Sequence, residues 1–120
     1  HNFIMELPNS YDTFVTQNNL SGGQKQKISI SRAIFKNSPI IAFDEATSFL
    51  DAESEQLVQQ SIDCLKDEKT CIIITHKLSK IVNANQIFVL QNGSIVETGT
   101  HEELMNKKGY YFDLFKYQQY

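Results

Sequence analysis

Two adjacent glycines at the expected start of a helix suggest that an anion approaches the backbone there. They lie in the stretch "NNLSGGQKQK", residues 18–27, in which Ser21 and Gln24 have the spacing of a capping box. The capping box leaves Gly22 and Gly23 unexplained, since glycine in a helix is destabilising by about 0.5–1 kcal/mol relative to alanine. Without side chains, they expose successive N–H groups at the positive end of the helix dipole, which suits a phosphate.

Two apolar stretches end in polar residues that could act on such a phosphate. Asp44 and Glu45 follow "IIAF", and His76 follows "CIIIT". An Asp directly after a buried strand is well placed to hold Mg²⁺, often through water, and the neighbouring Glu could polarise an attacking water. His76 could contact a terminal phosphate and sense its presence.

Each of these residues, considered alone, also has a plainer interpretation. The acidic pair could be a helix cap or a solvated pair, His76 an ordinary hydrogen-bonding residue, and Asp51 before "AESEQL" a helix N-cap. The functional interpretation is favoured because the glycine-rich helix start, the acidic pair, Asp51 and the histidine all occur in one short chain.

The apolar pattern predicts the elements that would position these residues. Strands that are apolar throughout alternate with amphipathic helices, a pattern typical of a parallel sheet covered on both faces. In such sheets ligands bind beyond the carboxyl ends of the strands, where Asp44, Glu45 and His76 stand. The predicted elements here are a helix over 21–35 with a largely buried apolar side, a strand over 40–43, a helix over 52–65 and a strand over 71–75.

The two flanks of the chain have local patterns of their own. At the start, Phe3, Ile4 and Leu7 suit one face of a helix that ends at Pro8. Towards the end, "QIFVL" predicts a third strand, joined to "SIVETG" by a two-residue hairpin turn at residues 92–93. A second capping box at residues 100–103 then opens a short helix, and a glycine separates it from an aromatic C-terminal helix.

Composition excludes some classes of protein. The net charge of -3 argues against a basic nucleic-acid-binding face. No apolar run approaches the roughly 20 residues of a membrane helix, and no signal peptide opens the chain. Cys64 and Cys71 lack zinc-ligand spacing and predict reduced residues in a cytosolic setting. Because the chain opens with His1, in an apolar stretch already under way, we expect it to be an internal piece of a longer protein.

Four motifs, in order and at family spacing, resemble those of the nucleotide-binding domain of ATP-binding cassette (ABC) transporters, exporter type. They are "LSGGQ" at 20–24, similar to the ABC signature, "IIAFDE" at 40–45, similar to the Walker B strand, "SFLD" at 48–51, similar to the D-loop, and "ITH" at 74–76, similar to the H-loop. The flanking "FIMELPNSYDT" and "LQNGSIVETGTHEELM" resemble exporter sequences as well.

The resemblance implies an α/β fold of the P-loop NTPase (RecA-like) type, with a mostly parallel sheet and flanking helices. It divides the chain into residues 1–35, the end of the helical signature subdomain, and residues 36–120, the C-terminal part of the catalytic core. It also implies an ATPase that uses ATP and Mg²⁺ and drives export. The domain would lie at the cytoplasmic face of the membrane, with transmembrane domains fused upstream.

Site roles follow from the resemblance residue by residue. Glu45 and His76 would be catalytic, and Asp44 would hold the metal. In the head-to-tail dimer of two nucleotide-binding domains, the signature of one domain closes over ATP held by the other, and Asp51 sits at the seam. The signature residues that would bind nucleotide are Leu20, Ser21, Gly22, Gly23 and Gln24.

The chain also departs from the family pattern. It contains no G-x-x-x-x-G-K-[ST] phosphate loop, no glutamine loop and no adenine-stacking aromatic residue, so the piece alone is predicted to be inactive. Residues 16–19 form a shortened stretch where exporters contact their membrane domains. Phe49 stands where the D-loop usually has alanine, and Lys25 and Lys27 stand where arginines are usual.

Two alternatives to an exporter ATPase remain at this stage. One is a soluble ABC-type ATPase acting on ribosomes or DNA, which the absence of coiled-coil arms and the exporter-like hairpin disfavour. The other is a non-catalytic fragment or subunit that supplies its signature to a partner's ATP site. The transported substrate is not encoded in this segment.

Overall fold

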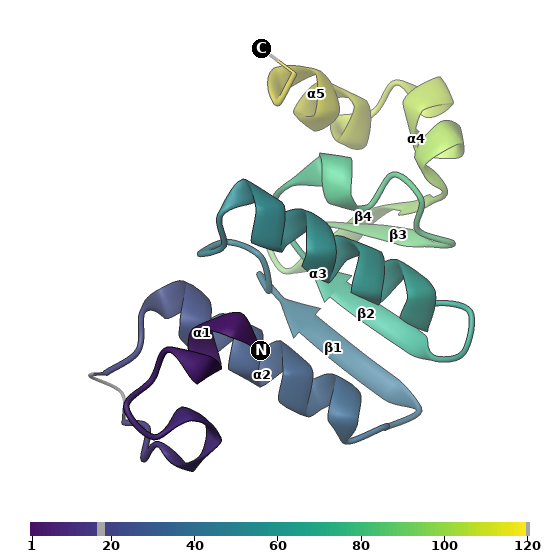
Figure 1. The fold of residues 1–120 in the computed structure, drawn as a ribbon. Helices are drawn as coiled ribbons and strands as arrows, with labels where there is room; N and C mark the ends of the chain where they lie inside the picture. Colours follow the sequence, from purple (N-terminus) through teal and green to yellow (C-terminus); the bar gives the residue numbers. More distant parts are fainter. Residues whose placement is uncertain (17–18, 120) are drawn as a thin grey trace. The chain divides into compact units, whose positions relative to one another are not determined.

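The computed structural model describes residues 1–16 and 19–119, which form two compact units, His1–Ile72 and Ile73–Tyr120 (Figure 1). The first unit contains α1 (Asn2–Met5), the 3₁₀ turn η1 (Ser10–Asp12), α2 (Gly22–Phe35), β1 (Ile40–Asp44) and α3 (Ala52–Leu65). Strand β2 (Thr70–Ile74) crosses the boundary between the units. The second unit contains η2 (Leu78–Lys80), β3 (Ile87–Gln91), β4 (Ser94–Gly99), α4 (His101–Lys107) and α5 (Tyr110–Tyr117).

The two long helices begin and end where the sequence predicts. Ser21 caps α2 in a complete capping box with Gln24, and Asp51 caps α3 by accepting a hydrogen bond from the Ser54 N–H. A third cap, Thr100 with Glu103, opens α4. These boundaries are predictable because a capping side chain satisfies backbone donors within three residues of itself.

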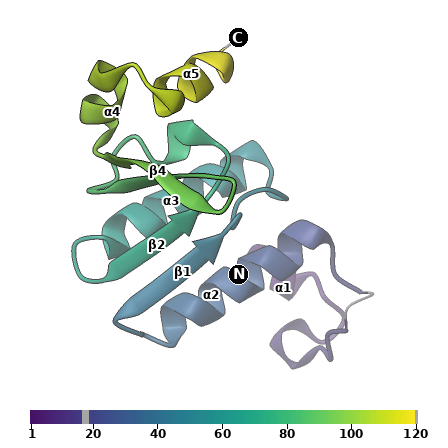
Figure 2. The same ribbon diagram turned by 180° about the vertical axis from the view of Figure 1, so that it is seen from behind.

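Strands β1 and β2 are joined through α3 and form a two-stranded sheet. In both views the two arrows run in the same direction, which is the arrangement of a parallel β-α-β unit (Figure 2). Asp44 is the last residue of β1, so the Asp44–Glu45 pair stands at the carboxyl end of that strand.

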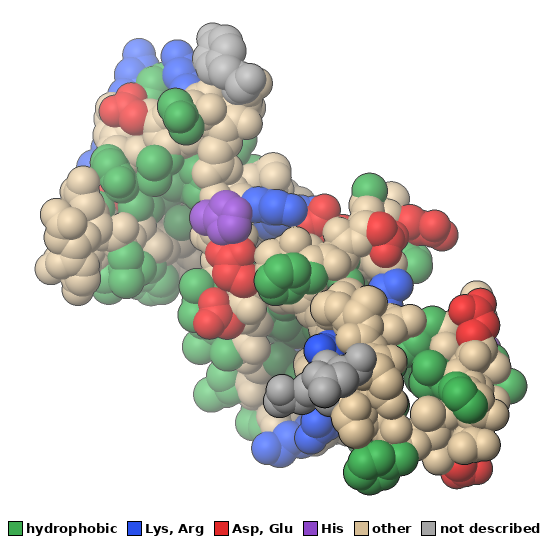
Figure 3. All heavy atoms as spheres, turned by 90° about the vertical axis from the view of Figure 1, so that its left-hand side faces the viewer, with side chains coloured by type: hydrophobic (Ala, Val, Ile, Leu, Met, Phe, Trp, Pro, Cys, Tyr) green, Lys and Arg blue, Asp and Glu red, His purple; other side chains and the backbone are tan. Residues whose placement is uncertain are grey.

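The strands are covered on one face only, which corrects the prediction of a sheet buried on both faces. In β1, Ile41 and Phe43 are buried, whereas Ile40 is 59% exposed. In β2 the exposed positions include Ile72 and Ile74. Because successive side chains of a strand point to opposite faces, the described part of the chain supplies cover for one face of these strands. Apolar side chains accordingly reach the surface in several places (Figure 3).

Helix α2 is also less buried than predicted. Ile30 is its buried residue, whereas Ile28 and Ile34 on the same apolar side are half-buried and Phe35 is 91% exposed. The reason is a shallow hollow of about 980 Å³ lined by residues of α1, α2 and α3, Leu57 among them, which leaves the apolar side of α2 without close packing.

Helix α1 is shorter than predicted. It ends at Met5 and buries no residue, and Leu7 lies outside it. Pro8 explains the early end, since a proline disfavours helical backbone at the residue before it.

In the second unit, β3 and β4 form the predicted antiparallel hairpin. Asn92 and Gly93 both have positive φ, 51° and 77°, as a tight two-residue hairpin turn requires. The hydrophobic core of the second unit consists of Leu78, Ile87, Val89, Leu104 and Tyr111. Among the described residues, no helix combines the length and apolarity that a membrane crossing requires.

Candidate functional site

The start of α2 presents the signature residues at the surface. Ser21 has extended backbone; its N–H donates to Gln24 Oε1 over 2.9 Å, and its Oγ accepts from the Gln24 N–H over 3.2 Å. Ser21 and Gly22 are exposed, and Leu20 before them is half-buried. The start of α2 therefore lies at the surface, where an anion could reach the N–H groups that the capping box leaves unused.

Gly23 has a second, intrachain reason to be glycine. A Cβ atom at this position would lie 3.0 Å from the backbone oxygen of Phe49, closer than ordinary contacts allow. At Gly22 the corresponding atom would meet the Phe49 side chain at an unstrained 3.8 Å. The close approach of the turn after β1 thus favours glycine at 23, whereas the exposed Gly22 has no neighbour this close.

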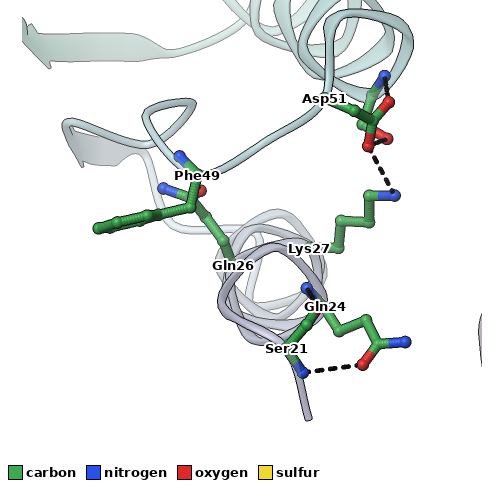
Figure 4. Close-up of polar contacts among 7 residues, drawn as sticks. Ser21, Gln24, Gln26, Lys27, Phe49 and Asp51 are labelled. Atoms are coloured by element: carbon green, nitrogen blue, oxygen red, sulfur yellow. Dashed lines mark hydrogen bonds and ion pairs between the residues drawn. The ribbon is translucent and has the colours of Figure 1, made fainter.

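The side chain of Gln26 joins α2 to the turn that follows β1 (Figure 4). Its Nε2 donates to the backbone oxygen of Glu45 over 3.0 Å, and its Oε1 accepts from the Phe49 N–H over 3.3 Å. One amide thereby contacts both ends of the segment between the acidic pair and the D-loop-like residues. This role of Gln26 is not predictable from sequence, because nothing local distinguishes it from other helical glutamines.

Glu45 adopts a left-handed backbone conformation, with φ of 49°. This region is uncommon for residues other than glycine and costs roughly 1–3 kcal/mol. Besides Gln26, the Glu45 oxygen accepts from the Ser48 N–H over 3.1 Å and from the Ser48 Oγ over 2.7 Å. Three donors converging on one carbonyl hold the turn that determines where the Glu45 side chain points.

Asp44 is exposed at the end of β1, and Glu45 is half-buried. Asp44 also lines a shallow hollow of about 470 Å³ together with Gly22, Lys25 and Phe49. Within residues 1–16 and 19–119, no three carboxylate, histidine or cysteine side chains group together as a metal site. A single carboxylate suits Mg²⁺ that arrives with phosphates and keeps its waters, because Mg²⁺ is commonly held by one or two carboxylates plus substrate oxygens.

Asp51 serves as the N-cap of α3 and also faces α2. Its carboxylate accepts from the Ser54 N–H over 2.9 Å and from the Ser54 Oγ over 2.7 Å. The hydrogen bonds from the backbone and side chain of Ser54 lower the pKa of Asp51 below its ordinary value. The Lys27 ammonium lies 3.8 Å from the same carboxylate in an exposed ion pair, which solvent screens strongly (Figure 4).

His76 lies in the second unit, whereas the other predicted site residues lie in the first. It follows β2, and its side chain is exposed. Its backbone oxygen accepts a hydrogen bond from Gln118 Nε2 over 2.6 Å, a contact that sequence analysis did not anticipate. The first unit therefore brings together the signature start, Asp44, Glu45 and Asp51, whereas His76 belongs to the second unit.

The shortened stretch 16–19 lies partly outside the described residues, because residues 17 and 18 are not among them. On either side of that gap, the Thr16 N–H donates to Asn19 Oδ1 over 2.7 Å, and Asn19 Nδ2 donates to the Phe14 oxygen over 3.0 Å. The ends of the stretch are thus tied together by the Asn19 side chain.

Comparison with known proteins finds close relatives along nearly the whole chain. A family model described as "ABC transporter" matches residues 3–48. A "Putative multidrug export ATP-binding/permease protein" of Staphylococcus aureus strain NCTC 8325 is 51% identical over 98% of this chain, and the protein of that description in strain Mu50 matches equally. The chain spans about a fifth of the length of these relatives, 21% in each case.

The fold of nearly the whole chain also matches a solved structure. It is described as "Structure of a bacterial Atm1-family ABC exporter with ATP bound", and the match covers 99% of this chain and 21% of that one, with a TM-score of 0.92 and 39% sequence identity.

Proposed function

Because this chain belongs to the ABC transporter family, we propose that it supplies the C-terminal part of the ATP-hydrolysing domain of an exporter. It is part of an exporter-type nucleotide-binding domain and has a P-loop NTPase-like α/β fold. The observation that carries this proposal is the match of 99% of the chain to an exporter with ATP bound. The complete protein would hydrolyse ATP to ADP and phosphate. Transmembrane domains in the same polypeptide would use the resulting movement.

The residues divide the work in this proposal. Glu45 polarises the attacking water, and His76 contacts the terminal phosphate. Asp44 holds Mg²⁺, which when bound neutralises charge on the phosphate oxygens. Placement of Asp44 and Glu45 at the carboxyl end of β1 supports these roles, since ligands bind at that end in open α/β sheets.

The signature residues act on a partner in this proposal. Ser21, Gly22 and Gly23 would bind the terminal phosphate of ATP held by a second nucleotide-binding domain, and Leu20 and Gln24 would complete that contact. The exposure of Ser21 and Gly22 at the start of α2 supports a role across an interface. Asp51 would lie at the seam of this head-to-tail dimer. We further propose that residues 1–35 end the helical subdomain and that the catalytic core begins at residue 36.

The test is Glu45→Gln in the complete protein. Glutamine keeps the size of the side chain but cannot accept the proton of water, so ATP turnover should fall by at least a hundredfold while ATP binding persists. Glu68→Gln, at an exposed position after α3, is the matched control and should turn over ATP like the unchanged protein. Full turnover in the Glu45→Gln protein would remove Glu45 as the base, and loss of ATP binding would point to a structural role instead.

A further inference from the structure

One glutamine side chain from the C-terminal helix holds the backbone of the loop that carries His76. Gln118 Nε2 donates to the His76 oxygen over 2.6 Å, and Gln118 Oε1 accepts from the Leu78 N–H over 3.0 Å. The amide thus pairs with the main chain on both sides of Lys77, as the backbone of a neighbouring strand would. Forty-two residues separate the two partners in sequence.

The loop needs such a partner because it has left the regular ladder of β2. β2 ends at Ile74 and η2 begins at Leu78, so residues 75–77 belong to neither element. Within the loop, the Lys77 N–H donates to Thr75 Oγ1 over 3.0 Å. Backbone groups outside regular structure still require partners, and Gln118 supplies them to His76 and Leu78.

The helix that presents Gln118 is firmly anchored in the second unit. Glu97, itself buried, accepts from the Tyr110 N–H over 3.2 Å and from the Tyr111 N–H over 2.8 Å, which fixes the start of α5. Tyr111 is 1% exposed and packs in one core with Leu78. Gln118 follows the last turn of α5, where its N–H donates to the Leu114 oxygen over 3.2 Å.

Gly109 sets the position at which α5 begins. A Cβ atom there would lie 1.9 Å from Glu97 Oε1, so only glycine allows the carboxylate to reach the first N–H groups of the helix. The anchor and the amide therefore lie at opposite ends of one short helix.

We propose that Gln118 is a positioning residue that orients His76 towards the terminal phosphate of ATP. The inference rests on the proposed function, in which His76 contacts that phosphate. In this proposal Gln118 acts through its two hydrogen bonds to the main chain of the loop, and His76 alone contacts the phosphate. It fixes the main chain from which the exposed His76 side chain extends, so that little rotation of the loop accompanies each turnover.

The first measurement is ATP turnover by the complete protein carrying Gln118→Ala. Displacement of a catalytic group by about 1 Å can cost on the order of a hundredfold, and we expect kcat to fall between roughly tenfold and a hundredfold with little change in KM. Gln119→Ala is the matched control, since the neighbouring glutamine lies on the same helix end and should leave turnover unchanged. Equal turnover by the Gln118→Ala and unchanged proteins would overturn the proposal.

A double-mutant cycle with His76→Ala distinguishes positioning from general stability. If Gln118 acts through His76, Gln118→Ala costs nothing further once His76 is alanine. The same loss in both backgrounds would overturn the proposal. Normal turnover by the His76→Ala protein would instead refute the phosphate-contacting role of His76, which is a failure of the proposed function and not of the hydrogen bonds.

Hydrogen–deuterium exchange across residues 75–80 provides a readout that does not depend on activity. Loss of the amide should speed exchange of the Leu78 N–H by tenfold or more in Gln118→Ala but not in Gln119→Ala. Gln118→Glu keeps an oxygen for the Leu78 N–H but faces the His76 carbonyl with a carboxylate, so it should lower kcat as well. Unchanged exchange in Gln118→Ala, or full activity in Gln118→Glu, would contradict the proposal.

Discussion

The Glu45 backbone is held in a conformation that the residue would not choose alone. Its left-handed φ places the side chain just beyond the end of β1, and the amide of Gln26 and both donors of Ser48 hold its carbonyl. A carboxylate that must hold a water molecule in one position requires a backbone with few accessible conformations. Support for Glu45 therefore comes from a helix nineteen residues earlier in the sequence as well as from its own turn.

Replacing Gln26 should loosen this turn. Gln26→Ala removes two hydrogen bonds, each contributing about 0.5–1.5 kcal/mol, so exchange of the Phe49 N–H should accelerate on the order of tenfold. In the complete protein we expect ATP turnover to fall several-fold.

Gln59→Ala provides the comparison, because Gln59 Nε2 donates over 3.3 Å to Asp63, an exposed residue of the same helix. Similar exchange and similar turnover in the two variants would show that Gln26 does not support the turn.

At the scale of elements, the caps decide how the helices begin. Asp51 caps α3, and its two hydrogen bonds from Ser54 stabilise the charged carboxylate. Since the pKa of Asp51 is lowered in the folded chain, its contribution to stability is present above the ordinary aspartate pKa and is lost as pH falls through the lowered value. The start of α3 should therefore weaken in acid, from about pH 4 downwards, and should not change near neutrality.

The effect of Ser54 on Asp51 can be measured directly. Ser54→Ala removes the hydroxyl donor but keeps the backbone N–H, so the pKa of Asp51 should rise part of the way towards its ordinary value. An NMR titration of the Asp51 carboxyl carbon measures this. Ser61→Ala, on the same helix but bonded to the Leu57 oxygen, should leave the titration unchanged. A rise of equal size in both variants would assign the effect to the helix as a whole.

Caps and turns were predictable from sequence because their causes are local. The starts of α2, α3 and α4 and the turn at residues 92–93 all depend on residues within three positions of each other. The positions of Asp44 and Glu45 followed from the strand pattern. Burial was not predictable, since whether Ile40 is covered depends on what packs against that face. The roles of Gln26 and Gln118 were not predictable, because their hydrogen-bond partners Glu45 and His76 lie 19 and 42 residues away in sequence.

At the scale of the whole molecule, the described chain carries only part of the machinery that the proposed function needs. The sequence holds the signature, the acidic pair and the histidine but no G-x-x-x-x-G-K-[ST] loop to surround the nucleotide phosphates. The chain spans about a fifth of its relatives. The proposed activity therefore belongs to a longer polypeptide.

The chain on its own should bind ATP poorly. Without a phosphate loop or a residue to stack on adenine, we expect a Kd above about 1 mM by calorimetry in the presence of Mg²⁺. A longer version that includes an upstream phosphate loop should bind at least tenfold more tightly. Sub-millimolar binding by the chain alone would contradict the prediction that ATP is held by a phosphate loop outside residues 1–120. It would require a phosphate site within them.

The one-sided cover of β1 and β2 also bears on how the protein is made. Ile40 and Ile74 remain exposed in this chain, and in the longer polypeptide that we propose, their cover would come from a part already released by the ribosome. At about 5–20 residues per second, translation of these 120 residues takes roughly 6–24 s. Until β1 and β2 have been made within that interval, the earlier part would keep its own apolar surface uncovered, so slow or interrupted synthesis here would favour chaperone binding over folding.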